Sequence, residues 1–154
     1  MENRKKCSII YVGIFFSMLL MFSSCNYIPC RGQDYLIANI TQKELINKFN
    51  DLREKYPEYV LGEDYINPHV PHYYIDLYWK DLDLRISLDI HIGEQIPNPP
   101  TRLKFLLVGD KDVTWNKDIN SKELDKKLNT LYIEKFEKEI LSELNVKWQR
   151  KSCW

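Results

Sequence analysis

The stretch Asp83–Ile92, which reads D-L-R-I-S-L-D-I-H-I, decides the fold that this sequence predicts. Aliphatic residues alternate with polar residues along its whole length. Because successive side chains of a strand point to opposite faces, this period of two places every aliphatic side chain on one face. A strand with one apolar and one polar face is typical of an antiparallel sheet that helices cover on the apolar side.

Further strands are predicted on both sides of this stretch. Tyr73–Lys80 shows the same alternation and is expected to pair with it in a hairpin that turns near Asp81 and Leu82. After a proline-rich loop at 93–101, a third strand is predicted at 102–108 and a fourth, shorter one at 113–115. Segment 58–72 mixes aromatic residues with Gly and Pro, which predicts a short edge strand or an ordered loop.

Two helices frame these strands in the sequence. Thr41 and Glu44 match a capping box, apolar residues follow at helical spacing, and Pro57 ends the pattern. A second, longer amphipathic helix is predicted from a capping box at Asn120 to a point near Val146. The predicted fold is therefore α+β, in the order helix, three to four antiparallel strands, helix. Both helices are expected to pack on one face of the sheet, the aliphatic face of Asp83–Ile92.

The N-terminal segment has the features of a secretory signal. Three basic residues, Arg4, Lys5 and Lys6, precede an uncharged apolar run from Ser8 to Phe22. This run is shorter than the ~20 residues that span a bilayer, which favours a signal peptide over a membrane anchor.

The residues that follow the apolar run, Phe22-Ser23-Ser24-Cys25, resemble the lipobox of bacterial lipoproteins. Phe22 stands where leucine is commoner, although looser boxes occur in Bacteroidetes-like bacteria. The resemblance, which covers only this segment, implies a signal peptide at 1–24 and lipidation of Cys25. Residues 25–39 show no sustained periodicity and are predicted to be a tether, and the remaining length predicts a single α+β domain at 40–154. In enterobacterial lipoproteins, an aspartate directly after the lipidated cysteine favours retention in the inner membrane, but here that position is Asn26. The acidic cluster that marks surface export in some Bacteroidetes lipoproteins is also missing from the residues after Cys25. The resemblance therefore implies an address at the periplasmic face of the outer membrane; the domain itself resembles no family.

Charge and cysteine content narrow the functional classes. Without residues 1–24 the chain keeps 19 of 22 basic and 21 of 22 acidic residues, a balance that argues against nucleic-acid binding. Cys7 leaves with the signal and Cys25 carries the lipid, so Cys30 and Cys153 remain. In an oxidising periplasm these two cysteines either form a disulfide or stay as reduced thiols on the chain ends.

The sequence offers few residues that could bind a metal or carry catalysis. His69, His72 and Asp76, with His91 nearby in the predicted hairpin, offer imidazole and carboxylate groups to a metal such as zinc, but their spacing matches none of the familiar metal signatures. Nucleophile elbows and phosphate-binding glycine loops are missing from the sequence. The prediction is a protein without catalytic activity or cofactor, and the alternative from this group of residues is a metal-dependent hydrolase.

The polar face of the predicted hairpin is the candidate binding surface. It is expected to present Tyr74, Asp76, Tyr78, Lys80, Arg85, Asp89 and His91, with the Pro97–Pro100 loop beside it. Tyrosine and arginine supply much of the binding energy at protein interfaces, whereas an ordinary solvated sheet face also carries such pairs. The leading hypothesis is a lipid-anchored module that binds a protein partner, similar in size and layout to immunity lipoproteins that neutralise toxins. The alternative is a structural or assembly component of the cell envelope.

Overall fold

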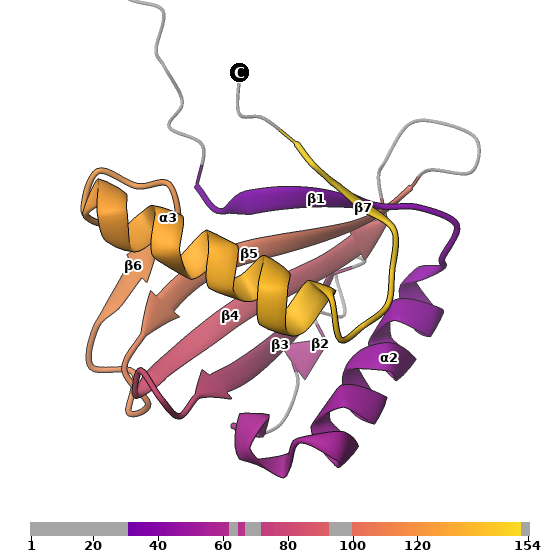
Figure 1. Ribbon diagram of the computed structural model, residues 1–154, viewed down its shortest axis with the longest axis horizontal. Coiled ribbons are helices and arrows are strands. Elements are labelled where there is room, and N and C mark those ends of the chain that lie inside the picture. The colour runs from indigo at the N-terminus through magenta and orange to yellow at the C-terminus, as the bar shows by residue number, and fades with distance from the viewer. Residues whose placement is uncertain (1–30, 62–64, 67–71, 93–99, 152–154) are drawn as a thin grey trace, which may run out of the picture.

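The structure is a computed structural model that describes residues 31–61, 65–66, 72–92 and 100–151. It contains one antiparallel sheet with two helices across one of its faces (Figure 1). The strands are β1 (Gln33–Ile37), β2 (Tyr65–Ile66), β3 (His72–Trp79), β4 (Leu84–Ile92), β5 (Thr101–Gly109), β6 (Asn116–Asp118) and β7 (Trp148–Arg150). The helices are α2 (Gln42–Lys55) and α3 (Lys126–Lys135), with a 3₁₀ turn η1 (Pro57–Tyr59) and a π-helical segment η2 (Phe136–Leu141).

The sheet has seven strands, six of them in the spatial order β2-β3-β4-β5-β1-β7. Strand β5 is long enough to take two partners along one edge. Its first part pairs with β1 and its last part with β6. Between them the backbone N–H of Ile119 donates to the carbonyl of Leu106 at 2.9 Å, so the edge stays occupied where one partner gives way to the next.

The α+β class is confirmed, but the predicted strand number and element order are wrong. The sheet has seven strands instead of three to four, and a strand precedes the first helix. Residues 33–37, predicted as part of the tether, form β1, which lies between β5 and β7. The chain enters β1 through Gly32, whose φ of 81° belongs to the left-handed region that glycine adopts readily. With only five residues, β1 is too short for alternation to distinguish it from a linker.

The central hairpin is confirmed. Strands β3 and β4 pair antiparallel, from His72 opposite His91 to Trp79 opposite Leu84. The turn between them includes Asp83 with a φ of 53°, a conformation that Asp and Asn tolerate better than most residues. The predicted edge strand between 58 and 72 exists as β2, which pairs with β3. The fourth strand begins at Asn116, later than predicted.

The first helix begins as predicted. Thr41 is the N-cap of α2: its side chain accepts from the backbone N–H of Glu44, and the Glu44 carboxylate accepts from the backbone N–H of Thr41. The second helix differs, because its N-cap is Asp125, whose carboxylate accepts from two backbone N–H groups. Asn120 instead lies in a left-handed turn with a φ of 63°. The helix continues through η2 to Leu141, and the chain then turns and adds β7 to the sheet.

Both helices pack on the same face of the sheet, as predicted (Figure 1). The aliphatic side chains of β4 and the apolar faces of α2, α3 and η2 belong to one buried cluster. At its centre the Phe136 ring lies 4.9 Å from the Phe105 ring and 5.6 Å from the Tyr35 ring, measured between centroids. One core therefore joins strands from both halves of the sheet to the second helix.

Within the described part of the chain, no helix combines the length and the apolar character that crossing a membrane requires.

Phe136 tests the importance of this core. Phe136→Ala is expected to lower the free energy of unfolding by about 3–5 kcal/mol, since a buried aromatic ring is lost and a cavity remains. Leu131→Ala, at an exposed position of α3, is the matched control and is expected to change it by no more than about 0.5 kcal/mol. Urea denaturation measures both values. Equal losses in the two variants would contradict the described packing.

Candidate functional site

The candidate site lies on the face of β3 and β4 that points away from the helices, here called the polar sheet face. Alternation along the strands places the predicted polar residues together on it, and the pairing sets Tyr74 opposite Asp89, Asp76 opposite Ser87 and Tyr78 opposite Arg85. Lys80 follows the end of β3 in the exposed turn. The prediction that these side chains share one face is therefore consistent with the strand register.

The middle of the polar sheet face is a hydrogen-bonded network. Asp76 accepts from Arg85 Nη1 at 3.1 Å and also from the Ser87 hydroxyl. Arg85 extends the network by donating to the side-chain oxygen of Asn116 on β6. Both Arg85 and Ser87 are only 9% exposed. Arg85, which the sequence suggested as an open contact residue, is thus a buried member of the network.

Tyrosine side chains border this network. The Tyr78 hydroxyl donates to the carboxylate of Asp83 in the hairpin turn, and this hydrogen bond raises the pKa of Tyr78. The Lys111 ammonium lies 5.8 Å from the centroid of the Tyr78 ring, within the range of a cation–π contact. Tyr74 and Tyr78 are both partly exposed. They are therefore accessible at the surface although their polar groups have neighbours.

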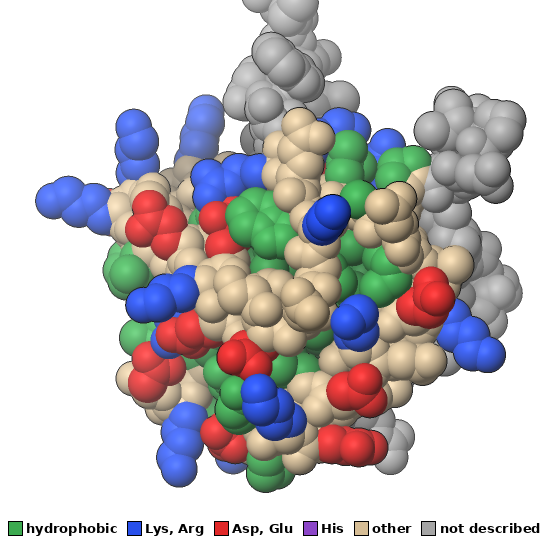
Figure 2. Space-filling model, turned by 45° about the vertical axis from the view of Figure 1, so that its right-hand side comes forward, with side chains coloured by type: hydrophobic (Ala, Val, Ile, Leu, Met, Phe, Trp, Pro, Cys, Tyr) green, Lys and Arg blue, Asp and Glu red, His purple; other side chains and the backbone are tan. Residues whose placement is uncertain are grey.

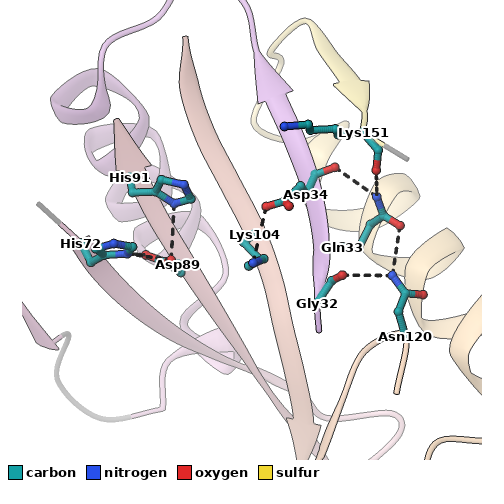
Figure 3. Close-up of polar contacts among 9 residues, drawn as sticks. All are labelled: Gly32, Gln33, Asp34, His72, Asp89, His91, Lys104, Asn120 and Lys151. Carbon is teal, nitrogen blue, oxygen red and sulfur yellow. Dashed lines mark hydrogen bonds and ion pairs between the residues drawn. The ribbon is translucent and has the colours of Figure 1, made fainter. Parts of the chain in front are cut away.

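A second group on the polar sheet face consists of His72, Asp89 and His91, here called the His-Asp cluster. His72 Nδ1 lies 2.8 Å from both carboxylate oxygens of Asp89, and His91 Nδ1 lies 3.4 Å from Oδ2 (Figure 3). The two imidazole rings are stacked, with centroids 4.9 Å apart. One candidate donor atom from each of the three residues lies within 4.8 Å of the others.

The cluster places a carboxylate in a buried position. Asp89 is only 4% exposed. Burial raises the pKa of this carboxyl, but the imidazoles of His91 and His72 lower it by more, and the pKa lies below its ordinary value. The folded protein therefore favours the ionised carboxylate.

Strand β5 lies on the other side of β4 and contributes positive charge. Arg102 is the register partner of His91, and Lys104 that of Asp89. Lys104 Nζ lies 3.9 Å from a carboxylate oxygen of Asp34 on β1, which partly neutralises it (Figure 3).

Of the three residues predicted as metal ligands, the two that the structure describes, His72 and Asp76, do not come together. His72 belongs to the His-Asp cluster, whereas Asp76 pairs with Arg85 instead of the imidazoles. His69 lies outside the described residues, as do Cys25, Cys30, Cys153 and most of the Pro97–Pro100 loop. Asp89 was assigned only to the binding face. Its place in the His-Asp cluster could have been predicted from its spacing to His91, because residues two positions apart on a strand lie on the same face.

The lowered pKa of Asp89 predicts an acid-dependent loss of stability. A carboxyl whose pKa is lower in the folded state contributes stability above its unfolded pKa, about 3.9, and loses it as the pH falls through the folded value. Between about pH 5 and pH 2, Asp89→Asn is expected to lose less unfolding free energy than the original protein, as measured by urea denaturation. Asp112→Asn, at an exposed turn position, is expected to follow the original protein. Parallel curves for the protein and Asp89→Asn would contradict the assignment.

Comparison of the chain with protein-family models, curated proteins and solved structures finds no significant match. The function is therefore inferred from the side chains of the polar sheet face.

Proposed function

We propose that this protein is a non-catalytic, lipid-anchored binding module of the cell envelope that captures a protein partner on its polar sheet face. The observation that carries this proposal is the one-sided packing of the helices (Figure 1). It leaves the opposite face of β3 and β4 with tyrosine and charged side chains, and Tyr74, Tyr78 and Lys80 remain at least partly exposed there.

Tyrosine suits this role because it buries a large area on binding at a small cost in conformational entropy. Beneath the tyrosines, Asp76, Arg85 and Ser87 hold one another through buried hydrogen bonds. Such a network reduces side-chain freedom before a partner arrives, and a preorganised surface loses less entropy on binding. The network therefore supports the tyrosine surface without itself being the contact.

Charge also favours a protein partner over nucleic acid. Basic and acidic side chains are interspersed over the surface seen in Figure 2, without a concentrated basic area on that face. Basic and acidic residues are equal in number over the whole chain, 22 of each. Nucleic-acid binding draws most of its affinity from a concentrated basic surface.

The anchor completes the proposal. Cys25, the lipidation position implied by the lipobox, lies eight positions before β1 begins at Gln33. A lipidated Cys25 would hold the domain at the periplasmic face of the outer membrane. A small anchored module that binds one protein there is comparable to the immunity lipoproteins, whose partner is a toxin.

One observation favours a second function, that of a structural or assembly component of the envelope. Asp76 accepts hydrogen bonds from both Arg85 and Ser87 on the same face. A sheet face that is merely solvated shows the same pairing. In this alternative the anchor is the functional feature and the tyrosines bind nothing.

Affinity capture distinguishes the two functions. The full-length chain, solubilised in detergent, is expected to retain one protein in stoichiometric amount from envelope and culture extracts, identified by mass spectrometry. Tyr74→Ala and Tyr78→Ala are each expected to weaken binding of that protein by about 30-fold, since truncating a central interface tyrosine costs roughly 2 kcal/mol.

The control for this capture is Leu131→Ala, an exposed apolar residue of α3 on the helix side of the sheet. It is expected to retain the partner fully. Arg85→Ala is unsuitable as a test, because it leaves the Asp76 carboxylate without its cationic partner. Equal retention by the protein and both tyrosine variants would refute the proposed surface and favour the structural role.

Lipidation gives an independent test of the anchor. In a bacterial host supplied with a labelled fatty acid, the protein is expected to incorporate label and to begin at Cys25 by mass spectrometry. Cys25→Ser is expected to lose the label, whereas Cys30→Ser, five positions along, is expected to keep it. Label that persists in Cys25→Ser would contradict the assignment.

A further inference from the structure

We propose that the His-Asp cluster is a binding site for a divalent zinc ion, with His72, Asp89 and His91 as its protein ligands. This inference does not depend on the proposed protein partner. It concerns three residues that the two central strands bring together on one face, at the end of the hairpin opposite its turn.

The chemistry of the donors selects the metal. Two imidazole nitrogens and one carboxylate form a mixed nitrogen and oxygen set that suits Zn²⁺ and related transition metals. Magnesium and calcium prefer ligand sets made entirely of oxygen.

The spacing of two of the three donor pairs is close to that of a tetrahedral ion, and the two imidazole donors, which lie within 4.8 Å of each other, would move closer together on binding. With metal–ligand distances near 2.0–2.2 Å, two ligand atoms of a tetrahedral zinc site lie about 3.3 Å apart. His91 Nδ1 already lies 3.4 Å from Asp89 Oδ2. His72 Nδ1 is closer, at 2.8 Å from both oxygens, because it forms a hydrogen bond to the carboxylate. A zinc ion would replace that hydrogen bond after an outward movement of the ring by about half an ångström.

One donor atom of the cluster lacks a hydrogen bond within the described part of the chain. His91 Nδ1 is buried and forms no hydrogen bond among the described residues, although it lies at ion-pair distance from Asp89. Buried polar atoms nearly always have a hydrogen-bond partner, and an exception calls for an explanation such as an ion. A metal bound beside Asp89 would satisfy this nitrogen.

The strand framework holds the ligands in place. Asp89 and His91 are two positions apart on β4, and His72 lies directly opposite His91 on β3. Ligands on paired strands are positioned more accurately than ligands on loops. Three protein ligands also leave the fourth position of a tetrahedral zinc ion for water or an external donor.

Neighbouring charge limits the affinity. The positive charge of Arg102, the register partner of His91, repels a metal cation bound nearby. The charge of Lys104 is already paired with Asp34. Zinc binding is therefore expected to be weaker than at a four-ligand structural site.

Metal titration of the full-length chain in detergent tests the inference. After treatment with a chelator, the protein is expected to bind one equivalent of Zn²⁺ per chain by calorimetry and elemental analysis. An excess of Mg²⁺ or Ca²⁺ is expected not to displace it. Substitution with Co²⁺ is expected to give the intense visible bands of a four-coordinate ion.

The variants locate the metal. His72→Gln and Asp89→Asn are each expected to weaken Zn²⁺ binding at least about tenfold, since even the loss of second-shell support costs 10–100-fold. Asp112→Asn, an exposed turn carboxylate outside the cluster, is the matched control and is expected to bind as the original protein does. Circular dichroism without metal checks the fold of each variant; should Asp89→Asn unfold, His72→Gln, with its partly exposed ring, decides. Less than one equivalent bound, or equal weakening in Asp112→Asn, would overturn the proposal.

Discussion

The pairing of β1 between β5 and β7 is the constraint on which the rest of the structure depends. This short N-terminal strand joins the centre of the sheet to the C-terminal strand. Its central residue, Tyr35, is fully buried, contacts the Phe136 and Trp148 rings and donates its hydroxyl to Glu137. Burial raises the pKa of this phenol, which therefore stays neutral. Gln33, at the start of the strand, donates to the carbonyl of Lys151 at 2.9 Å (Figure 3).

The same arrangement explains the polar sheet face. Because Tyr35, Phe105 and Phe136 bring the second helix to the apolar side, α2 and α3 share that side (Figure 1). The polar residues of β3 and β4 then pair with one another and with neighbours at the same face, such as Asn116 of β6, which accepts from Arg85. The Asp76–Arg85 network and the His-Asp cluster are two results of this arrangement. Each holds one buried nitrogen without a hydrogen bond among the described residues, Arg85 Nε in the network and His91 Nδ1 in the cluster.

The sequence predicts the parts of this fold that repeat over many residues. The alternation of β3 and β4 and the capping box of α2 are local patterns, and both appear in the structure. Strands β1, β6 and β7 have five, three and three residues, too few for alternation to define. The pairing of β1 and β7 also depends on distant segments, whereas β6 pairs with the preceding strand β5. The site follows the same division. The shared face of the polar residues is local, whereas the preference of Asp76 for Arg85 and of His72 for Asp89 depends on strand register.

The position of β1 also has a mechanical consequence. If Cys25 carries the lipid, residues 26–32 alone connect the membrane to a strand in the interior of the sheet, a span of at most about 25 Å. A pull on the anchor would act along β1, in shear, on its ladders with β5 and β7 together. Strands loaded in shear share the force among several hydrogen bonds at once. The domain would thus be attached through a strand held by two ladders, at no more than about 25 Å from the bilayer.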